Sequence, residues 1–183
     1  MSEPWFTLIF LAQSPAEKEN KKDQGVVDMK KEKKLRNSAK AVIIQNGKLL
    51  VIEKKDGNSR FCVLPGGGQE KTENLRETLI REVAEEVGAK VEVGTLLHVR
   101  EYVSEDHFPR PDLELRQVEF FFECKLLEDY EPKNGTHPDQ RQQKMKWVKL
   151  DELDKVNFYP TCLQESLMNH KKDKFPVYLG ECN

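Results

Sequence analysis

Residues 67–89 read GGQEKTENLRETLIREVAEEVGA, in which a glycine-rich turn leads into a helical pattern. Asn74 is a suitable N-cap residue, and Glu77 follows three residues later to complete a capping box. Gly88 suits the left-handed position that follows the end of a helix. These signals predict a helix over about residues 75–87, and we expect the rest of the chain to support it.

The predicted helix carries one apolar stripe and one cluster of acids. Its apolar residues recur at helical spacing and can pack on a core: Leu75, Leu79, Ile80, Val83, Ala84 and Val87. Glu82, Glu85 and Glu86 lie beside the stripe at spacings where like charges each weaken a helix by roughly 0.2–0.5 kcal/mol. A divalent cation would reverse that repulsion, and Mg²⁺ prefers such oxygen ligands. The alternative is a solvated charged face without a metal.

The residues around these acids favour the metal site. Gly67 is followed after five residues by Glu73, and after seven more by REVAEEVGA from Arg81 to Ala89. This pattern resembles the signature box of the Nudix hydrolases, and so many fixed positions make a chance match rarer than for a lone glycine-rich motif. The chain departs from the family at Thr72, where glycine is common, and at Ala89, where a larger aliphatic residue is usual. Neither departure removes a charge that the chemistry needs.

The resemblance implies an enzyme that hydrolyses a nucleoside diphosphate linked to a further group. It implies Mg²⁺ or Mn²⁺ held by Glu82, Glu85 and Glu86, and a pair between Glu73 and Arg81 that braces the turn against the helix. Either Glu85 or Glu86 is expected to accept the proton of the attacking water, because a carboxylate beside the metal can act as the base. Some members of the family take this base from a loop instead.

Two further carboxylates are alternative bases or ligands. Asp139 lies in the polar loop before Trp147, the kind of position from which some Nudix members take a catalytic carboxylate. Glu119 lies near the start of a predicted strand and is the other candidate. The positions of these carboxylates in the sequence do not show which of them is the base.

Contacts to the substrate are expected from the turn of Gly66, Gly67 and Gly68, together with Arg100 and Tyr102. An arginine and a tyrosine could stack on a base or pair with phosphates, although ordinary strand residues are an equally good interpretation. In the family, a proline or a tyrosine at a fixed distance after the box is associated with the ADP-ribose or the dinucleoside polyphosphate subgroup, respectively. The chain has Glu105 at that spacing, so neither substrate is assigned.

The chain outside the box alternates strand and turn signals. Strands are expected over residues 40–45 and 49–53, joined by Asn46-Gly47, and then over residues 60–64, 91–103, 117–127 and 144–150. Gly94 is expected to place a bulge in one of them. A helical turn from Asp151 and a helix over residues 162–169 should follow. The pattern predicts an α/β fold, an α/β/α sandwich around a mixed β-sheet, which is also the Nudix fold.

A single domain is expected from a length of 183 residues. We assign residues 38–183 to the Nudix hydrolase domain and residues 1–37 to a flexible or disordered extension, because that segment is charged and has little apolar periodicity. Its apolar run at residues 5–12 is too short to span a bilayer, and Met29 is an alternative start of translation. Residues 104–114 contain two prolines and many charges, and are either a substrate lid or a disordered crossover.

Composition argues against several classes of protein. With 30 basic and 32 acidic residues, the chain gives no support to a polyanion-binding surface, so no nucleic-acid partner is expected. The four cysteines are widely separated, which favours a reduced protein of the cytoplasm: Cys62, Cys124, Cys162 and Cys182. The four histidines are equally scattered, and are more typical of ordinary residues than of zinc ligands: His98, His107, His137 and His170.

The sequence therefore predicts a nucleotide pyrophosphohydrolase that depends on Mg²⁺ or Mn²⁺, acts on a small-molecule nucleotide and has no membrane partner. ADP-ribose or nucleotide-sugar hydrolysis is an alternative among enzymes. A nucleotide-binding regulatory module on the same fold is the alternative from another class. The presence of all three box glutamates favours the enzyme. A sensor does not need three neighbouring glutamates, and their mutual repulsion would favour replacement by neutral residues. The oligomeric state stays open, and a homodimer is compatible with the sequence.

Overall fold

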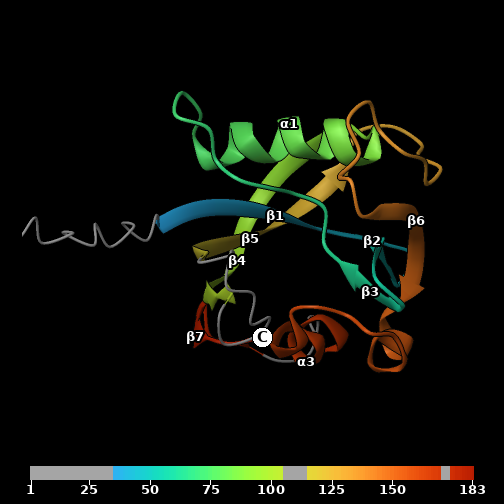
Figure 1. Ribbon diagram of the computed structural model, residues 1–183. Coiled ribbons are helices and arrows are strands. Elements are labelled where there is room, and N and C mark those ends of the chain that lie inside the picture. Colours follow the sequence, from blue (N-terminus) through green and yellow to red (C-terminus); the bar gives the residue numbers. More distant parts are fainter. Residues whose placement is uncertain (1–34, 105–114, 170–173) are drawn as a thin grey trace, which may run out of the picture. The chain divides into compact units, whose positions relative to one another are not determined.

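The computed structural model describes residues 35–104, 115–169 and 174–183 (Figure 1). Nearly all of the predicted N-terminal extension and of the predicted lid at residues 104–114 lies outside the described residues. The first strand, β1, begins at Leu35, before the predicted start of the folded domain at Ser38. Residues 35–37 are therefore part of the sheet.

Within the described residues, seven strands form one mixed sheet. They are β1 Leu35–Gln45, β2 Lys48–Asp56, β3 Ser59–Val63, β4 Val91–Val103, β5 Arg116–Leu126, β6 Gln142–Lys149 and β7 Tyr178–Glu181. The order is β3-β2-β1-β5-β4-β7, and β6 pairs with β2. The β1–β5 and β4–β7 pairs are parallel, and the other pairs are antiparallel. This arrangement confirms the predicted α/β fold, although β7 was not predicted.

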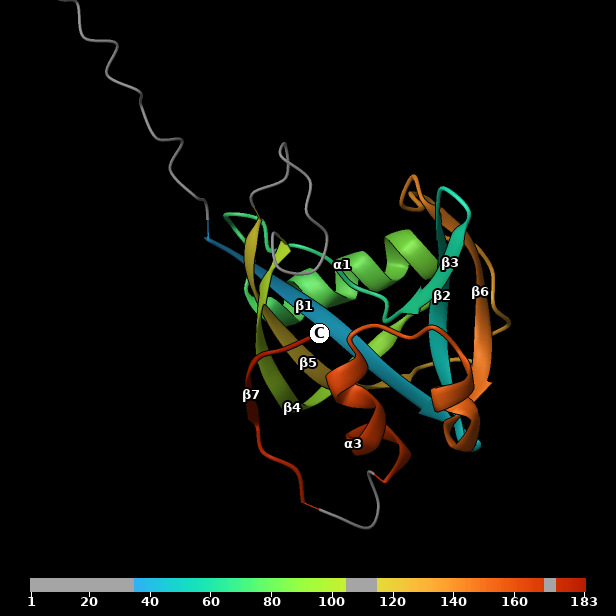
Figure 2. The same ribbon diagram turned by 60° about the horizontal axis from the view of Figure 1, so that its bottom comes forward.

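Helices cover the two faces of the sheet (Figures 1 and 2). The long helix α1, Leu75–Val87, packs on one face. The other face is covered by the 3-10 helices η1 Leu150–Lys155 and η2 Thr161–Leu163 and by the short helix α3 Gln164–Met168. The closing helix predicted over residues 162–169 is thus a 3-10 turn that continues into a short α-helix.

The core consists of two apolar clusters, because neighbouring residues of a strand point to opposite faces of the sheet. Along β1, β2 and β5, successive residues belong alternately to the two clusters. The cluster beneath α1 contains Ile43, Leu50, Ile52 and Phe122. The cluster beneath η1, η2 and α3 contains Val42, Leu49, Val51 and Phe121. These strands read as continuous apolar runs because both of their faces are buried.

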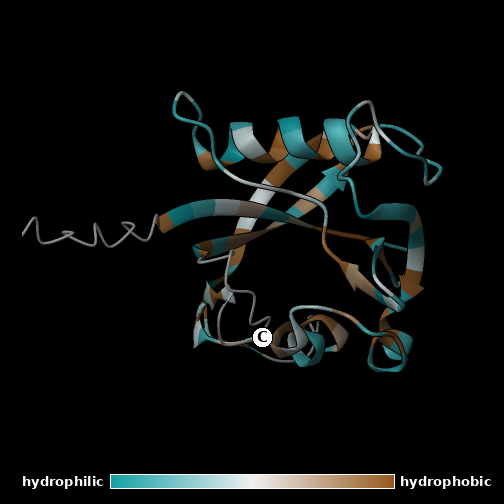
Figure 3. Cartoon of the chain, viewed as in Figure 1, coloured by the Kyte–Doolittle hydropathy of each residue, from teal (hydrophilic) through white to brown (hydrophobic). Residues whose placement is uncertain are grey.

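Helix α1 follows its sequence signals closely. The Asn74 side chain accepts hydrogen bonds from the backbone N–H groups of Arg76 and Glu77, and the Glu77 carboxylate accepts one from the Asn74 N–H, which completes the predicted capping box. Gly88 ends the helix in the left-handed region at φ 64°. Along its length α1 alternates hydrophilic and hydrophobic residues (Figure 3). One member of the predicted stripe, Ile80, is instead 48% exposed, because it lies at the border of the buried side.

Two glycine signals in the strands are also confirmed. Asn46 and Gly47 have positive φ angles of 50° and 73°, which is the backbone of a tight hairpin turn between β1 and β2. The pairing of β4 with β5 shifts register between Val93 and Leu96, where Gly94 was expected to cause a bulge. Among the described residues, no helix combines the length and the apolar character needed to cross a membrane.

Candidate active site

The glycine turn, residues 66–68, is fixed to β1 before it enters α1. The Ala39 N–H donates to the Gly67 carbonyl at 2.9 Å, and the Ala41 N–H donates to the Pro65 carbonyl at 2.8 Å. Gly66 has a φ of 124°, and a Cβ atom there would lie 2.2 Å from the Ala39 carbonyl oxygen. Only glycine allows this close approach, so Gly66 lets the turn pack directly against β1.

Two of the predicted metal ligands, Glu82 and Glu86, lie against the glycine turn. A Cβ atom on Gly67 would lie 2.4–2.5 Å from the Glu82 carboxyl group, so the missing side chain leaves room for this carboxylate. Glu86 Oε2 accepts a hydrogen bond of 2.7 Å from the Gly66 N–H. Burial raises the pKa of Glu86 above its ordinary value, while Lys40 and the Gly66 N–H act in the opposite direction. The turn and the acidic side of α1 therefore form one surface.

Arg81 connects the remaining box residues. Its guanidinium donates to both Glu73 carboxylate oxygens at 2.6 and 2.9 Å, so the predicted contact is present and bidentate. It also donates to Glu82 Oε1 at 2.9 Å, to Glu85 Oε2 at 3.1 Å and to the Gly68 carbonyl at 3.2 Å. The hydrogen bonds from Arg81 lower the pKa of Glu73 to about 2. One cation thus links the loop before the helix, the turn and two of the box carboxylates.

The lowered pKa of Glu73 predicts a specific dependence of stability on pH. Above the ordinary value of 4.5, the carboxylate is ionised in both states and the pair with Arg81 stabilises the folded state fully. This contribution is lost as the pH falls from 4.5 towards about 2. We therefore expect the difference in thermal midpoint between wild type and Glu73→Gln to be largest near neutral pH and to shrink across that window.

The control for this pH series is Glu92→Gln, which changes an exposed glutamate of β4. Its thermal midpoint should follow that of the wild type at every pH. A midpoint difference for Glu73→Gln that stayed constant from neutral pH down to the acid end of the window would contradict the assigned pair.

The box carboxylates Glu82, Glu85 and Glu86 do not converge on one point. Across the part of the chain that the structure describes, no group of three or more His, Cys, Asp or Glu side chains is arranged to hold a metal ion. Glu82 and Glu85 turn towards Arg81, and Glu86 turns towards Gly66. Their chemistry nevertheless fits a hard cation, because they offer carboxylate oxygens from neighbouring turns of one helix. A metal would have to compete with Arg81 for two of them.

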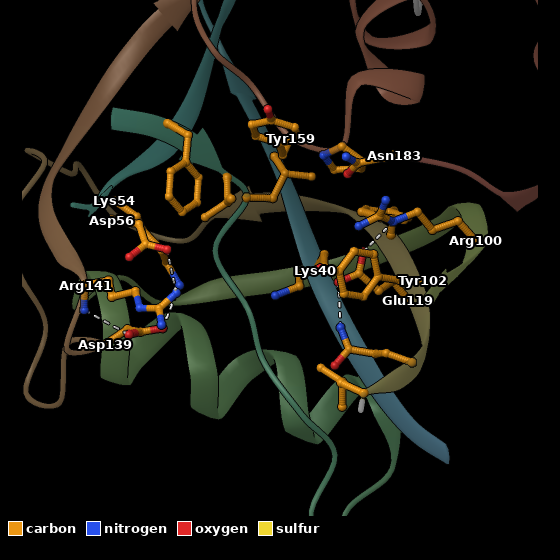
Figure 4. A pocket seen from close by; sticks show the side chains of 17 residues that line it. Lys40, Lys54, Asp56, Arg100, Tyr102, Glu119, Asp139, Arg141, Tyr159 and Asn183 are labelled. Carbon is orange, nitrogen blue, oxygen red and sulfur yellow. Dashed lines mark hydrogen bonds and ion pairs between the residues drawn. The ribbon is translucent and has the colours of Figure 1, made fainter. Parts of the chain in front are cut away.

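A cavity of about 470 Å³ lies beside the box and collects residues from distant parts of the chain (Figure 4). Four of the predicted site residues line it: Arg100, Tyr102, Glu119 and Asp139. Apolar and aromatic walls come from Phe61, Phe121 and Tyr159, among others. The box carboxylates are not among its lining residues. The structure therefore separates the predicted site into a carboxylate surface and an adjoining pocket.

Lys40 links these two parts and was not among the site residues predicted from the sequence. The side chain lines the pocket, and its Nζ donates to the Gly66 carbonyl of the glycine turn. In Figure 4 it lies between the cluster around Arg100 and the cluster around Asp139. A lysine inside the otherwise apolar run AKAVII was the signal available in the sequence, because placing a charge in a buried strand is costly unless the charge is paired.

A buried ion pair forms one end of the pocket. Arg100 Nε donates to Glu119 Oε2 at 2.6 Å, and the two side chains are only 6% and 7% exposed. Gln117 donates to the other carboxylate oxygen at 2.7 Å. The Arg100 guanidinium also lies 5.1 Å from the centroid of the Tyr102 ring. Because both oxygens of Glu119 accept strong hydrogen bonds, this residue is better suited to fixing Arg100 than to accepting a proton from water.

Asp139 forms part of the opposite end of the pocket. Its carboxylate pairs with Lys54 at 2.7 Å and also accepts a hydrogen bond from the Arg141 N–H. Partial burial raises the pKa of Asp139, but these hydrogen bonds outweigh burial, and the pKa lies below its ordinary value. A carboxylate with a lowered pKa is a weaker proton acceptor at neutral pH. The contacts with Lys54 and Arg141 therefore make Asp139 a poor candidate for the loop-borne base proposed from the sequence.

The prediction of four reduced cysteines is wrong for two of them. Cys162 and Cys182 form a disulfide across 20 residues of sequence, while Cys62 and Cys124 are free and buried. Burial raises the pKa of the Cys124 thiol to about 12, as expected for an inert packed cysteine. Spacing in the sequence could not reveal the disulfide, because only the fold brings the end of the described chain back to η2.

The comparisons with known proteins identify the family of the chain. The family model described as the NUDIX domain matches residues 34–165. Since this covers well over half of the chain, the protein belongs to the Nudix hydrolase family, as its box predicted. The chain is also similar to an ADP-ribose pyrophosphatase of Methanocaldococcus jannaschii, with 39% identity over 70 residues. That match covers 38% of this chain and only 40% of the archaeal protein.

Solved structures extend the likeness to most of the fold. A Nudix hydrolase from Nitrosomonas europaea superposes with a TM-score of 0.62 and 20% identity, over 79% of this chain and 94% of that one. An ADP-ribose pyrophosphatase from Streptococcus suis gives a TM-score of 0.54 and 21% identity, over 80% of this chain and 98% of that one. At such identities these structures show a shared fold.

Proposed function

We propose that the protein hydrolyses a pyrophosphate bond in a nucleoside diphosphate derivative, with Mg²⁺ or Mn²⁺ bound at Glu82, Glu85 and Glu86. The observation that carries this proposal is the contact of the acidic side of α1 with the glycine turn, immediately beside a pocket for a small molecule. When bound, a divalent ion supplies positive charge to the pyrophosphate and lowers the pKa of an attacking water.

The chain's own residues would position the substrate. Lys40 contacts the glycine turn and lines the pocket, so it places a cation between them that can pair with phosphate groups. Arg81 and Glu73 act as positioning residues, because they hold the turn and the box carboxylates in one arrangement. This arrangement supports a role in positioning the substrate, because correct placement accounts for much of the catalysis in phosphoryl transfer.

Glu86 is our preferred proton acceptor, with Glu85 as the second choice. The Glu86 residue is 7% exposed, the Gly66 N–H holds its carboxylate on the glycine turn at 2.7 Å, and burial raises its pKa. Glu85 is more exposed and is already paired with Arg81. Glu119 and Asp139 are both occupied by cations, so we assign them to the pocket walls.

ADP-ribose is the candidate substrate that we favour within this class. The named relatives in M. jannaschii and S. suis are ADP-ribose pyrophosphatases, and this is the support that they give. The pocket has aromatic walls for a base and charged groups at both ends for a second polar moiety. Nucleotide sugars share the same pyrophosphate linkage and are the next class. A cytoplasmic location and a homodimer stay predictions.

The test is a substrate panel with purified protein and Mg²⁺: ADP-ribose, nucleotide sugars, nucleoside triphosphates and dinucleoside polyphosphates. We expect hydrolysis that stops when EDTA removes the metal, and AMP with ribose 5-phosphate as the products from ADP-ribose. Chromatography identifies the products, and phosphate or pyrophosphate release gives the rates. Binding of nucleotides without any turnover would support the regulatory module instead.

A further inference from the structure

The last described segment, residues 178–183, contributes one residue to the lining of the pocket. Asn183 is one of the lining residues, and it lies near Arg100 in Figure 4. The carbonyl of Cys182 accepts a hydrogen bond of 2.5 Å from Arg100 Nη1. Arg100 in turn holds Glu119. The segment therefore completes the set of acceptors around the buried guanidinium.

The sheet holds this segment weakly. Strand β7 is four residues long, and only two of its residues are in register with β4. The Val99 N–H donates to the Val177 carbonyl at 2.7 Å, but the bond from the Cys182 N–H to Glu101 is long, at 3.5 Å. Tyr178 is 60% exposed, so its ring adds little burial, and its link to β4 is an exposed hydrogen bond from its hydroxyl to Glu101 at 2.6 Å. An edge strand with so few contacts is expected to exchange readily with solvent unless something else anchors it.

The Cys162–Cys182 disulfide supplies the anchor. It ties the segment to η2, where the Cys162 N–H also donates to the Asn183 carbonyl at 3.1 Å. Both cysteines are partly exposed, so a reductant can reach them. The bond therefore joins the segment to the helices on the far side of the sheet from α1.

We propose that this disulfide makes the pocket sensitive to redox state. A dithiol reductant attacks one sulfur as a thiolate and breaks the S–S bond, and its second thiol then closes the reductant's own disulfide. The reductant supplies two electrons and two protons, and Cys162 and Cys182 become thiols. The segment then leaves β4, Arg100 loses the Cys182 carbonyl, and Asn183 no longer lines the pocket. The effect on catalysis rests on the proposed function, but the effect on the pocket does not.

The experiment compares the oxidised and dithiothreitol-reduced full chain. Alkylation in denaturant should modify two cysteines in the oxidised form, Cys62 and Cys124, and four in the reduced form. Hydrogen exchange is then followed in peptides covering residues 178–183 and 99–103. We expect faster exchange in both peptides after reduction, because the Val99 N–H loses its acceptor. We also expect kcat/KM for the best substrate of the panel to fall about tenfold, as for the loss of one charged hydrogen bond.

Two variants sharpen the test. The double variant Cys162→Ser/Cys182→Ser should behave like the reduced wild type in both buffers. Tyr178→Phe removes the hydroxyl bond to Glu101 but keeps the disulfide, and should behave like the oxidised wild type. Unchanged exchange in residues 99–103 after reduction would overturn the proposal, as would an unchanged kcat/KM. If no nucleotide is hydrolysed, the proposed function fails, and the exchange data alone decide the redox proposal.

Discussion

Glu86→Gln and Glu85→Gln are each expected to lower turnover at least about a hundredfold with little loss of folding. Each change removes a charge that a divalent cation needs, and Glu86→Gln also removes our preferred proton acceptor. The fold should tolerate the exchange, because the amide oxygen of glutamine can still accept the hydrogen bond from the Gly66 N–H. Burial of an uncharged amide is also less costly than burial of a carboxylate.

The matched control is Glu77→Gln on the same helix. Its side-chain oxygen can still accept the hydrogen bond from the Asn74 N–H, so the capping box persists and turnover should stay near that of the wild type. The measurements are kcat at saturating Mg²⁺, the thermal midpoint, and Mg²⁺ affinity by calorimetry. Near-normal turnover in both Glu85→Gln and Glu86→Gln would remove the proposed site.

The features that the sequence predicted well are set within a few neighbouring residues. The cap at Asn74, the end at Gly88 and the hairpin at Asn46-Gly47 each depend on the local backbone, so short patterns predict them. The contact of Arg81 with Glu73 also follows from the box, since it spans one turn and the start of one helix. Ile80 shows the limit of such patterns. The spacing of apolar residues predicts which side of the helix is buried, but it does not predict how far the buried surface extends around the helix.

The features that escaped the sequence depend on contacts between distant segments. Lys40 reaches both the turn and the pocket only because β1 crosses beneath them. The disulfide and β7 bring the last described residues beside Arg100, and no short pattern marks either one. The contacts of Arg81 with Glu82 and Glu85 were also not predicted, and they offset part of the repulsion among the box carboxylates, whose role as metal ligands stays a prediction.

Arg81→Ala is expected to lower kcat/KM at least about tenfold and also to lower the thermal midpoint. The change leaves Glu73 without its cation and leaves Glu82 and Glu85 as uncompensated neighbours. The glycine turn also loses the hydrogen bond to the Gly68 carbonyl, so the turn should loosen. Misplacement of a substrate by even one ångström can reduce the rate about a hundredfold. Arg81→Lys should restore little, because an ammonium cannot make the bidentate pair.

A double-mutant cycle with Glu73→Ala isolates the pair from the other contacts of Arg81. We expect the losses in unfolding free energy to be less than additive, because either single change already removes the pair. Arg76→Ala serves as the control on the same helix, since Arg76 is exposed and donates to the Val93 carbonyl instead of to the box acids. It should keep both turnover and additivity with Glu73→Ala. Fully additive losses for Arg81→Ala and Glu73→Ala would show that the bidentate contact does not contribute to stability in solution.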